Sequence, residues 1–264
     1  MDRDRLLADA LFSVFLACSL FFVSVLSLRI LTFGFPLSLL SILGLLAIVA
    51  ALALAAVRMG VWFLGATALL LVLGLTLSAQ SVYAASLAVQ LMLLTFPFMW
   101  LRFYKKRGMG EALSELGFTG RRLLLNVVLG VVVTIFLLYP LVIAEVMVLE
   151  NFFGVTDIGN VSRVIEEAPW WLLLFSFTIA PVAEETFFRA FLQPRLGIQL
   201  TTVLFALAHY SYGSVAEFIG ALTIGLLFAV MYERTRSIAS VASGHAVFNL
   251  ISISVVYLQK LSGA

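Results

Sequence analysis

Acidic and basic side chains stand close together in one strongly apolar stretch of the chain. Glu184 and Glu185 are adjacent, and Arg189 follows Glu185 by four residues. Residues four apart share one face of a helix, so Glu185 and Arg189 can form an ion pair. Glu184 points about 100° away from that face, and no basic residue lies one turn from it. Glu184 is therefore the carboxylate that the sequence leaves for acid–base chemistry.

The two histidines of the chain, His209 and His245, lie in two other apolar stretches. Phe205 precedes His209 by four residues and Asn249 follows His245 by four, so each pair shares one helix face. An imidazole can hold or polarise a water molecule, and imidazole with carboxamide can stabilise an oxyanion. We expect Phe205 to serve packing. Together with Glu184, the residues His209, His245 and Asn249 provide the base and the hydrogen-bond donors that peptide hydrolysis by an activated water requires.

The composition explains why these polar residues are notable. Hydrophobic residues make up 63% of the 264 residues and charged residues only 11%, whereas soluble domains have about 45–50% and about 25%. These values exclude a soluble globular domain, a disordered chain and a nucleic-acid-binding protein. The single cysteine, Cys18, excludes a disulfide-stapled secreted domain. The remaining class is an integral membrane protein.

Long apolar runs without strand-like alternation predict an all-α, polytopic bundle of transmembrane helices. Nine segments are candidates for spans: 8–28, 36–57, 61–80, 83–101, 123–148, 170–191, 199–214, 215–232 and 238–258. The seventh and eighth are short, and the second and third are nearly continuous, so a count of eight stays open. Within one integral membrane domain, we expect residues 1–122 to hold N-terminal spans and a cytoplasmic interfacial helix, and residues 123–264 a catalytic membrane core.

Basic residues distinguish the two sides of the membrane. With nine spans, twelve of the sixteen Lys and Arg residues fall on the side of the N-terminus. The other side receives Arg29, Arg163 and Lys260, while Arg189 lies inside a span. The positive-inside rule therefore predicts a cytoplasmic N-terminus. Three further acids lie near predicted span ends, where we expect them to snorkel to the interface: Glu145, Glu217 and Glu233.

Depth indicates whether the polar residues can meet. With cytoplasmic span boundaries at about residues 191, 199 and 238, the four polar residues lie about 10 to 17 Å below the cytoplasmic surface. Those residues are Glu184, His209, His245 and Asn249. Three helices thus place their polar groups in one slab of the membrane. We expect a shared cavity that opens to the cytoplasm.

The chain carries three short motifs in this order: Glu184-Glu185-x-x-x-Arg189, Phe205-x-x-x-His209 and His245-x-x-x-Asn249. Together they resemble the motifs of the CAAX prenyl protease type 2 family. Its superfamily also holds the lysostaphin-resistance-protein-A-like and bacteriocin-processing (Abi) membrane proteases. The resemblance covers about residues 165–258, and no motif position departs from it. It implies an intramembrane CAAX-type endopeptidase, glutamate-dependent and often classed as a metalloprotease. Its substrate would be a prenylated CAAX-type or related membrane-associated peptide, cleaved near the C-terminus.

The resemblance implies the same roles that the chemistry of the side chains favours. Glu184 and His209 would activate the water, and His245 and Asn249 would stabilise the oxyanion. The Glu185–Arg189 pair would support the end of its helix.

A metal ion is the open alternative for this chemistry. Glu184, His209 and His245 form a complete catalytic zinc set, because such zinc takes three protein ligands and a water. The chain lacks the His-Glu-x-x-His spacing, however. If Glu184 were a ligand, no obvious base would remain except the paired Glu185. We therefore favour a mechanism without a cofactor and keep zinc as the alternative.

Two other classes of function stay open. Acid, histidine and asparagine in midspan could bind protons or ions in a coupled membrane transporter. Against this, the two halves of the chain share no motif. The third class is a catalytically inactive membrane scaffold whose cavity only binds partners. Cleavage of a peptide by the purified protein, and its loss in Glu184→Gln, distinguishes the enzyme from both.

Overall fold

In a computed structural model of this chain, residues 82–210 and 213–262 are described. All regular elements in these ranges are helices. The chain divides into two compact units, residues 1–112 and 113–264, which we treat separately. The predicted spans 8–28, 36–57 and 61–80 lie outside the described residues. In the first unit, α4 (Val82–Met99) overlaps the predicted span 83–101, and η1 (Trp100–Tyr104) follows it. A short helix, α5 (Met109–Glu115), comes next.

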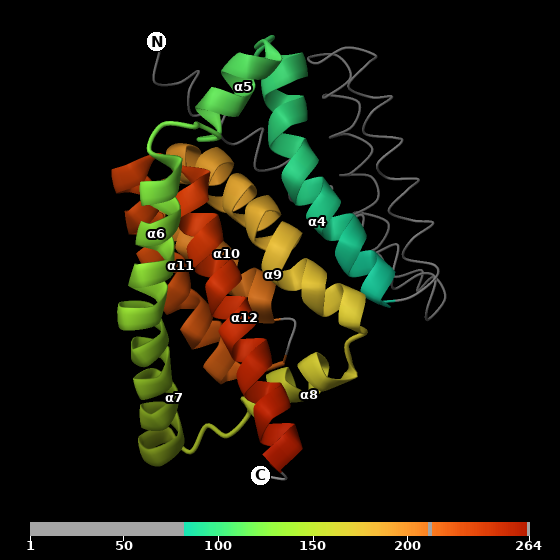
Figure 1. Cartoon of the computed structure of the whole chain (residues 1–264), viewed down its shortest axis with the longest axis vertical. Helices are drawn as coiled ribbons and strands as arrows, with labels where there is room; N and C mark the ends of the chain where they lie inside the picture. The colour runs from blue at the N-terminus through green and yellow to red at the C-terminus, as the bar shows by residue number, and fades with distance from the viewer. Residues whose placement is uncertain (1–81, 211–212, 263–264) are drawn as a thin grey trace, which may run out of the picture. The chain divides into compact units, whose positions relative to one another are not determined.

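Four helices of the described part are long and apolar enough to cross a membrane: Leu123–Phe153, Trp170–His209, Val215–Thr235 and Ile238–Ser262. The first contains α6 (Leu123–Val133), η2 (Thr134–Leu138) and α7 (Tyr139–Phe153). The second contains α9 (Trp170–Glu185), η3 (Thr186–Leu192) and α10 (Gln193–His209). The last two are α11 and α12, and the short α8 (Gly159–Glu167) precedes α9 (Figure 1). The prediction of an all-helical membrane protein is confirmed for these residues.

The second long helix folds back on itself at Gly197. Gly197 has φ 80° and ψ 167°, a conformation that glycine adopts without strain. The ring of Phe188 lies 5.2 Å from that of Phe205, so α10 returns along η3. The predicted spans 170–191 and 199–214 are therefore the two arms of a helical hairpin. The second arm ends at His209, five residues earlier than the sequence indicated.

The core of the second unit lies among α9, α10, α11 and α12. Its largest buried side chains include Phe191, Phe205 and Phe228, each at most 1% exposed. In contrast, α6 and α7 expose apolar residues such as Leu124 at 77%. Figure 1 shows this pair of helices at the edge of the bundle, where α6 packs against α12. Exposed apolar side chains on a span are those that lipid would cover.

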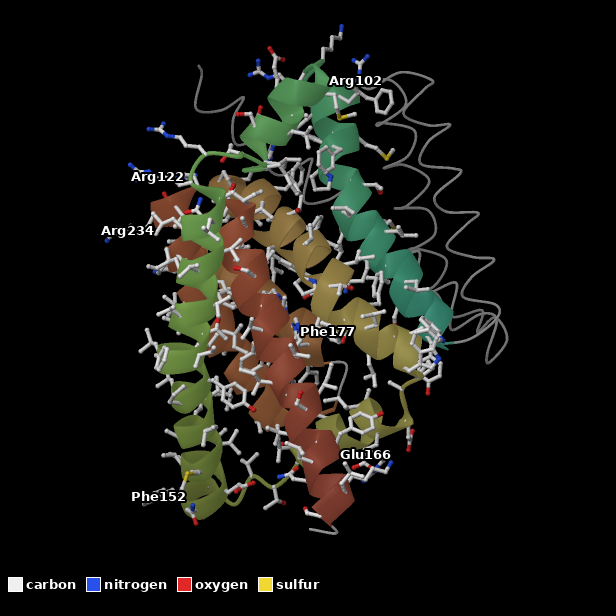
Figure 2. All side chains as sticks on the ribbon, in the orientation of Figure 1. Arg102, Arg122, Phe152, Glu166, Phe177 and Arg234 are labelled. Atoms are coloured by element: carbon white, nitrogen blue, oxygen red, sulfur yellow. The ribbon has the colours of Figure 1, made fainter. Side chains whose placement is uncertain are left out.

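Labelled charged residues mark the two ends of this unit (Figure 2). Arg122 and Arg234 lie toward one end of the bundle, and Phe152 and Glu166, on different helices, lie toward the other end. The first end is where α6 and α12 begin and α11 ends. The helices therefore run between an end with Arg122 and Arg234 and an end where Glu166 pairs with Lys260 at 3.4 Å.

The backbones of α6 and α12 approach each other very closely. A Cβ atom at Gly130 would lie 2.0 Å from the Ser240 carbonyl oxygen and 2.4 Å from Ser243 Oγ. A Cβ atom at Gly244 would lie 2.8 Å from Thr134 Oγ1. Small residues permit such contacts between membrane helices, which are stabilised by packing. Only glycine fits at position 130 without a shift of one helix.

Gly130→Ala is expected to lower the free energy of unfolding by about 1–3 kcal/mol, because α6 must move away from α12. Thermal unfolding of the purified protein in detergent measures the change. Gly159→Ala is the matched control, since a Cβ there meets no atom within 4 Å. An unchanged unfolding midpoint for Gly130→Ala would contradict the close helix contact.

Asp157 holds the start of α11 from a loop outside the long helices. Its carboxylate accepts hydrogen bonds from the Ser214 hydroxyl at 2.9 Å, from the Val215 N–H and from the Ala216 N–H at 3.1 Å. The amide of Asn160 donates to the Gly213 carbonyl at 2.9 Å. The connection between His209 and α11 is thus held by the segment that precedes α9.

Asp157 should make unfolding pH-dependent. Slight burial raises the pKa of its carboxyl, but the N–H groups of Val215 and Ala216 and the Ser214 hydroxyl outweigh it, so the pKa lies below its ordinary 3.8. This contribution to stability is complete above the unfolded-state pKa and is lost as the pH falls through the folded-state pKa. Asp157→Ala should lower the unfolding midpoint at pH 7 by about 2–4 °C. The difference from the unmodified protein should shrink below pH 4, and a constant difference would contradict the assignment.

Candidate active site

Three helices bring one acid and two imidazoles together. Glu184 Oε2 on α9 lies 3.9 Å from His209 Nε2 on α10 and 3.9 Å from His245 Nε2 on α12. Ligand atoms of the three residues all lie within 4.8 Å of one another. Glu184 stands thirteen residues before the bend at Gly197 and His209 twelve residues after it. The two arms of the hairpin therefore carry them to the same level.

Hydrogen bonds on the far side of each ring define how the imidazoles face the site. His209 Nδ1 lies 2.9 Å from the Phe205 carbonyl oxygen, which can only accept, so Nδ1 carries the proton. His245 Nδ1 lies 2.9 Å from Glu185 Oε1 and donates to it. In the neutral form of each ring, Nε2 then offers a lone pair toward Glu184. These tautomers follow from the partners of the rings.

A fully buried ion pair supports this arrangement from behind. Arg189 Nε donates to Glu185 Oε2 at 2.9 Å, and both side chains are 0% exposed. The pair predicted from the four-residue spacing is therefore present. Arg189 lies in η3, a π-helical continuation of α9, and such segments are often found at functional sites. Because Glu185 binds both Arg189 and His245, it connects the ion pair to the imidazole.

Phe205 lies at the centre of the cluster. Its ring centroid is 4.5 Å from that of His209 and 5.9 Å from that of His245. The guanidinium of Arg189 lies over the same ring at 4.5 Å, at the distance of a cation–π contact. Packing was expected for Phe205, and the ring packs against both histidines and the buried arginine at once.

The residues of this site lie in a range that matches a protein-family model. Residues 166–251 match the family model described as Type II CAAX prenyl endopeptidase Rce1-like. The chain is similar to that family in this range. The resemblance seen in the motifs is confirmed there, and the matched residues include all three motifs. No curated protein and no solved structure matches the chain.

Asn249 also lies in the Rce1-like region, at the contact between α12 and α9. Its Nδ2 donates to the Ser176 carbonyl oxygen at 2.8 Å. A carboxamide nitrogen carries two N–H bonds, so this contact leaves a second donor. The structure thus assigns Asn249 a helix-to-helix hydrogen bond that the sequence did not indicate.

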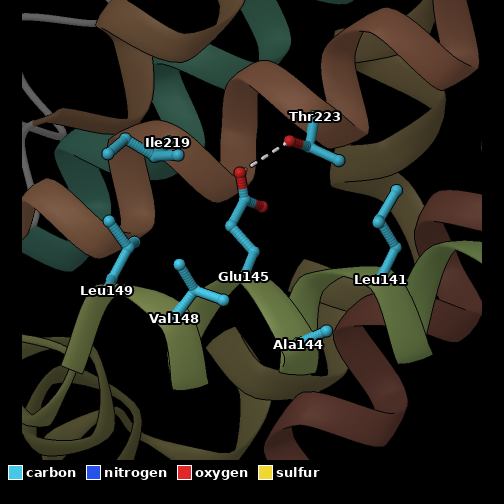
Figure 3. A pocket seen from close by; sticks show the side chains of 7 residues that line it. All are labelled: Leu141, Ala144, Glu145, Val148, Leu149, Ile219 and Thr223. Carbon is cyan, nitrogen blue, oxygen red and sulfur yellow. Dashed lines mark hydrogen bonds between the residues drawn. The ribbon is translucent and has the colours of Figure 1, made fainter. Parts of the chain in front are cut away.

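Two of the three acids expected to snorkel have other surroundings. Glu217, in the first turn of α11, is close enough to interact electrostatically with both His209 and His245. Glu145 accepts a hydrogen bond from Thr223 Oγ1 at 3.0 Å. It lines an otherwise apolar groove of about 430 Å³ between α7 and α11 (Figure 3). No spacing within one helix signals either contact, because both join different helices.

The third acid, Glu233, behaves as expected. Its side chain is 43% exposed at the end of α11, where it pairs with Arg236. It also accepts a hydrogen bond from Gln193 Nε2 at 3.2 Å.

The distances among Glu184, His209 and His245 test whether a zinc ion fits. Zinc bonds of about 2.0–2.2 Å in a tetrahedron separate two ligand atoms by about 3.4 Å. A water molecule held at about 2.8 Å by two partners separates them by about 4.6 Å. The observed 3.9 Å lies between these values. These two distances would have to shorten by about 0.5 Å for zinc or lengthen by about 0.7 Å for water, so the donor set can adapt to either group.

Proposed function

We propose that this protein is an intramembrane endopeptidase in which Glu184 activates a water molecule. The observation that supports it most strongly is the meeting of Glu184 with two imidazoles from separate helices inside the Rce1-like region. An ionisable cluster in membrane-spanning helices is costly and needs a functional reason. The substrate class is a prenylated CAAX-type or related membrane-associated peptide, cleaved near its C-terminus.

In the proposed reaction, Glu184 takes one proton from a water molecule whose other O–H donates a hydrogen bond to His209 Nε2. The water oxygen attacks the peptide carbonyl, and the carbonyl oxygen gains negative charge. His245 with a proton on both nitrogens can donate to this oxyanion through Nε2 while its Nδ1 donates to Glu185. The second N–H of Asn249 is the other proposed donor. Glu184 then returns its proton to the leaving amine as the carbon–nitrogen bond breaks.

Zinc is the alternative means of activating the water. Glu184, His209 and His245 would hold the ion, which would supply a bound water that ionises more easily. Glu185 would then orient His245 as a ligand. We favour the cofactor-free reaction because Glu184 remains available as the base.

We also propose that the N-terminus is cytoplasmic and that the site opens to the cytoplasmic side of the membrane. Arg122 and Arg234 lie at one end of the bundle (Figure 2), which the positive-inside rule assigns to the cytoplasm. Cysteine substitutions at Arg122 and Glu166, each in a Cys18→Ser background, test this in intact cells. Labelling of the residue-122 cysteine by a membrane-impermeant thiol reagent would contradict it.

A cleavage assay with purified protein tests the proposed function. It compares a farnesylated CAAX peptide with its unlipidated twin, each with and without a chelator. Cleavage of the lipidated peptide that survives chelation is the expected result. Loss of activity on chelation would overturn the cofactor-free reaction in favour of zinc. Ion-coupled uptake into liposomes with no peptide cleaved would establish the transporter instead.

A further inference from the structure

The buried arginine of the site has only part of its hydrogen bonds among the described residues. Arg189 Nε donates to Glu185, but Nη1 and Nη2 are buried and have no hydrogen-bond partner in that part of the chain. These two nitrogens carry four N–H donors. Donors that lose water on folding and gain no acceptor are strongly unfavourable. Arg189 Nη1 and Nη2 therefore need a hydrogen-bond acceptor other than the side chains of the described residues.

Two buried acceptors lack a partner in the same way. Gln193 Oε1 and Thr202 Oγ1 have no hydrogen-bond partner in the described ranges, and the two residues are 3% and 6% exposed. Gln193 Nε2 donates to the Ala229 carbonyl oxygen at 2.9 Å. A carbonyl oxygen can only accept, so this bond defines which end of the amide is nitrogen. Gln193 Oε1 is therefore an acceptor and complements the donors of Arg189.

The hairpin places these atoms at neighbouring levels. Gln193 follows Arg189 by four residues, about one helical turn. Arg189 lies opposite Phe205, at 4.5 Å from its ring. The two arms of the hairpin are antiparallel, so Thr202, three residues before Phe205, lies at the level between Arg189 and Gln193, and its side chain packs against Gly225 of α11. Two unpartnered donor groups and two unpartnered acceptors thus share one buried layer of the bundle.

We propose that this layer binds a water molecule, which accepts from Arg189 Nη1 and Nη2 and donates to Gln193 Oε1 and Thr202 Oγ1. Buried water typically has two to four polar partners of this kind. An anion would fit poorly, because Glu185 already balances the charge of Arg189. The carbonyl oxygen of Gln193, which can only accept, would also repel an anion. Gln193 is therefore a positioning residue that acts on Arg189 through bound water.

The proposed water would join two sets of hydrogen-bonded side chains in the second unit into one network. Gln193 contacts Glu233 at the partly exposed end of α11, at 3.2 Å. On the other side, Arg189 contacts Glu185, and Glu185 contacts His245 Nδ1 at 2.9 Å. Removing the water would loosen Arg189, then Glu185, and finally the orientation of the His245 ring. This effect on catalysis rests on the proposed function, whereas the water site itself does not.

Two substitutions and their combination test the water site. Gln193→Leu and Thr202→Val should each lower kcat by about tenfold, the typical effect of removing an outer hydrogen-bond partner. The double variant should lose no more than the worse single variant, because each change already releases the same water. Thr202→Ser keeps the hydroxyl and should keep full activity. Gln199→Leu, at an exposed glutamine of the same helix, is the matched control and should change nothing.

Thermal unfolding provides a second measurement that does not require activity. The same non-additive pattern should appear in the unfolding midpoints, even if no peptide is cleaved and the proposed function fails. Gln193→Leu as stable as the unmodified protein, or strictly additive losses, would overturn the water site. A high-resolution experimental structure is decisive if Gln193→Leu fails to fold. Ordered water at Arg189 Nη1 or Nη2 supports the proposal, and direct bonds from both nitrogens to protein oxygens overturn it.

Discussion

Glu184→Gln is expected to lower kcat for peptide cleavage by about 10²–10⁴-fold, the usual contribution of a general base. The amide keeps the shape of the side chain but cannot take a proton from water. Glu184 Oε2 faces two imidazole nitrogens at 3.9 Å, so the change acts at the centre of the cluster. Single-turnover cleavage of a lipidated peptide measures the loss, and the unfolding midpoint should stay within a few degrees.

The chain offers a matched control for this substitution. Glu145 is another membrane-embedded acid, hydrogen-bonded to Thr223 in the groove between α7 and α11. Glu145→Gln makes the same chemical change away from the imidazoles and should leave kcat within about twofold. Wild-type kcat in Glu184→Gln would exclude glutamate as the base and leave the proposed reaction without its first step.

Arg189→Ala is expected to lower the free energy of unfolding by about 3–5 kcal/mol, the cost of leaving one member of a buried ion pair alone. Its partner Glu185 is 0% exposed and cannot reach water. Cleavage should also be lost, because Glu185 orients His245. Chemical unfolding and the cleavage assay measure the two effects. Arg234→Ala, at an exposed residue of α11, should change neither.

A double variant separates the stability role of this pair from its catalytic role. Glu185→Leu with Arg189→Met replaces both charges by apolar side chains, which often restores or raises stability. We expect most of the lost stability to return and cleavage to stay absent, since His245 Nδ1 no longer has its acceptor. An active double variant, or a fully active and stable Arg189→Ala, would remove the supporting ion pair from the mechanism.

The sequence was sufficient for contacts that depend on one helix alone. The Glu185–Arg189 pair follows from their spacing, and the structure has it at 2.9 Å. The common level of Glu184 and His209 was also predictable. They lie seven and ten residues from the predicted boundaries at 191 and 199, and the bend at Gly197 falls between those boundaries.

Contacts between helices were not predictable, because they depend on how each helix is rotated about its axis. The hydrogen bond from Asn249 to the Ser176 carbonyl joins α12 to α9, and that between Thr223 and Glu145 joins α11 to α7. The spacing of residues in a sequence defines which side chains are neighbours within one helix, but not which residues of two helices face each other. The π-helical η3, which contains Arg189, also escaped prediction.

The glycine contact between α6 and α12 has a consequence for how precisely the catalytic ring is located. His245 comes five residues after Ser240, whose carbonyl oxygen lies against Gly130. A slip of α12 by a single residue would carry the imidazole about 1.5 Å along the helix axis, and errors of about 1 Å can cost 10²-fold in rate. The close contact with Gly130 of α6 therefore keeps α12 from sliding along its axis. Engineering for thermostability should target the lipid-facing surface of α7 and leave the contact between Gly130 and Ser240 unchanged.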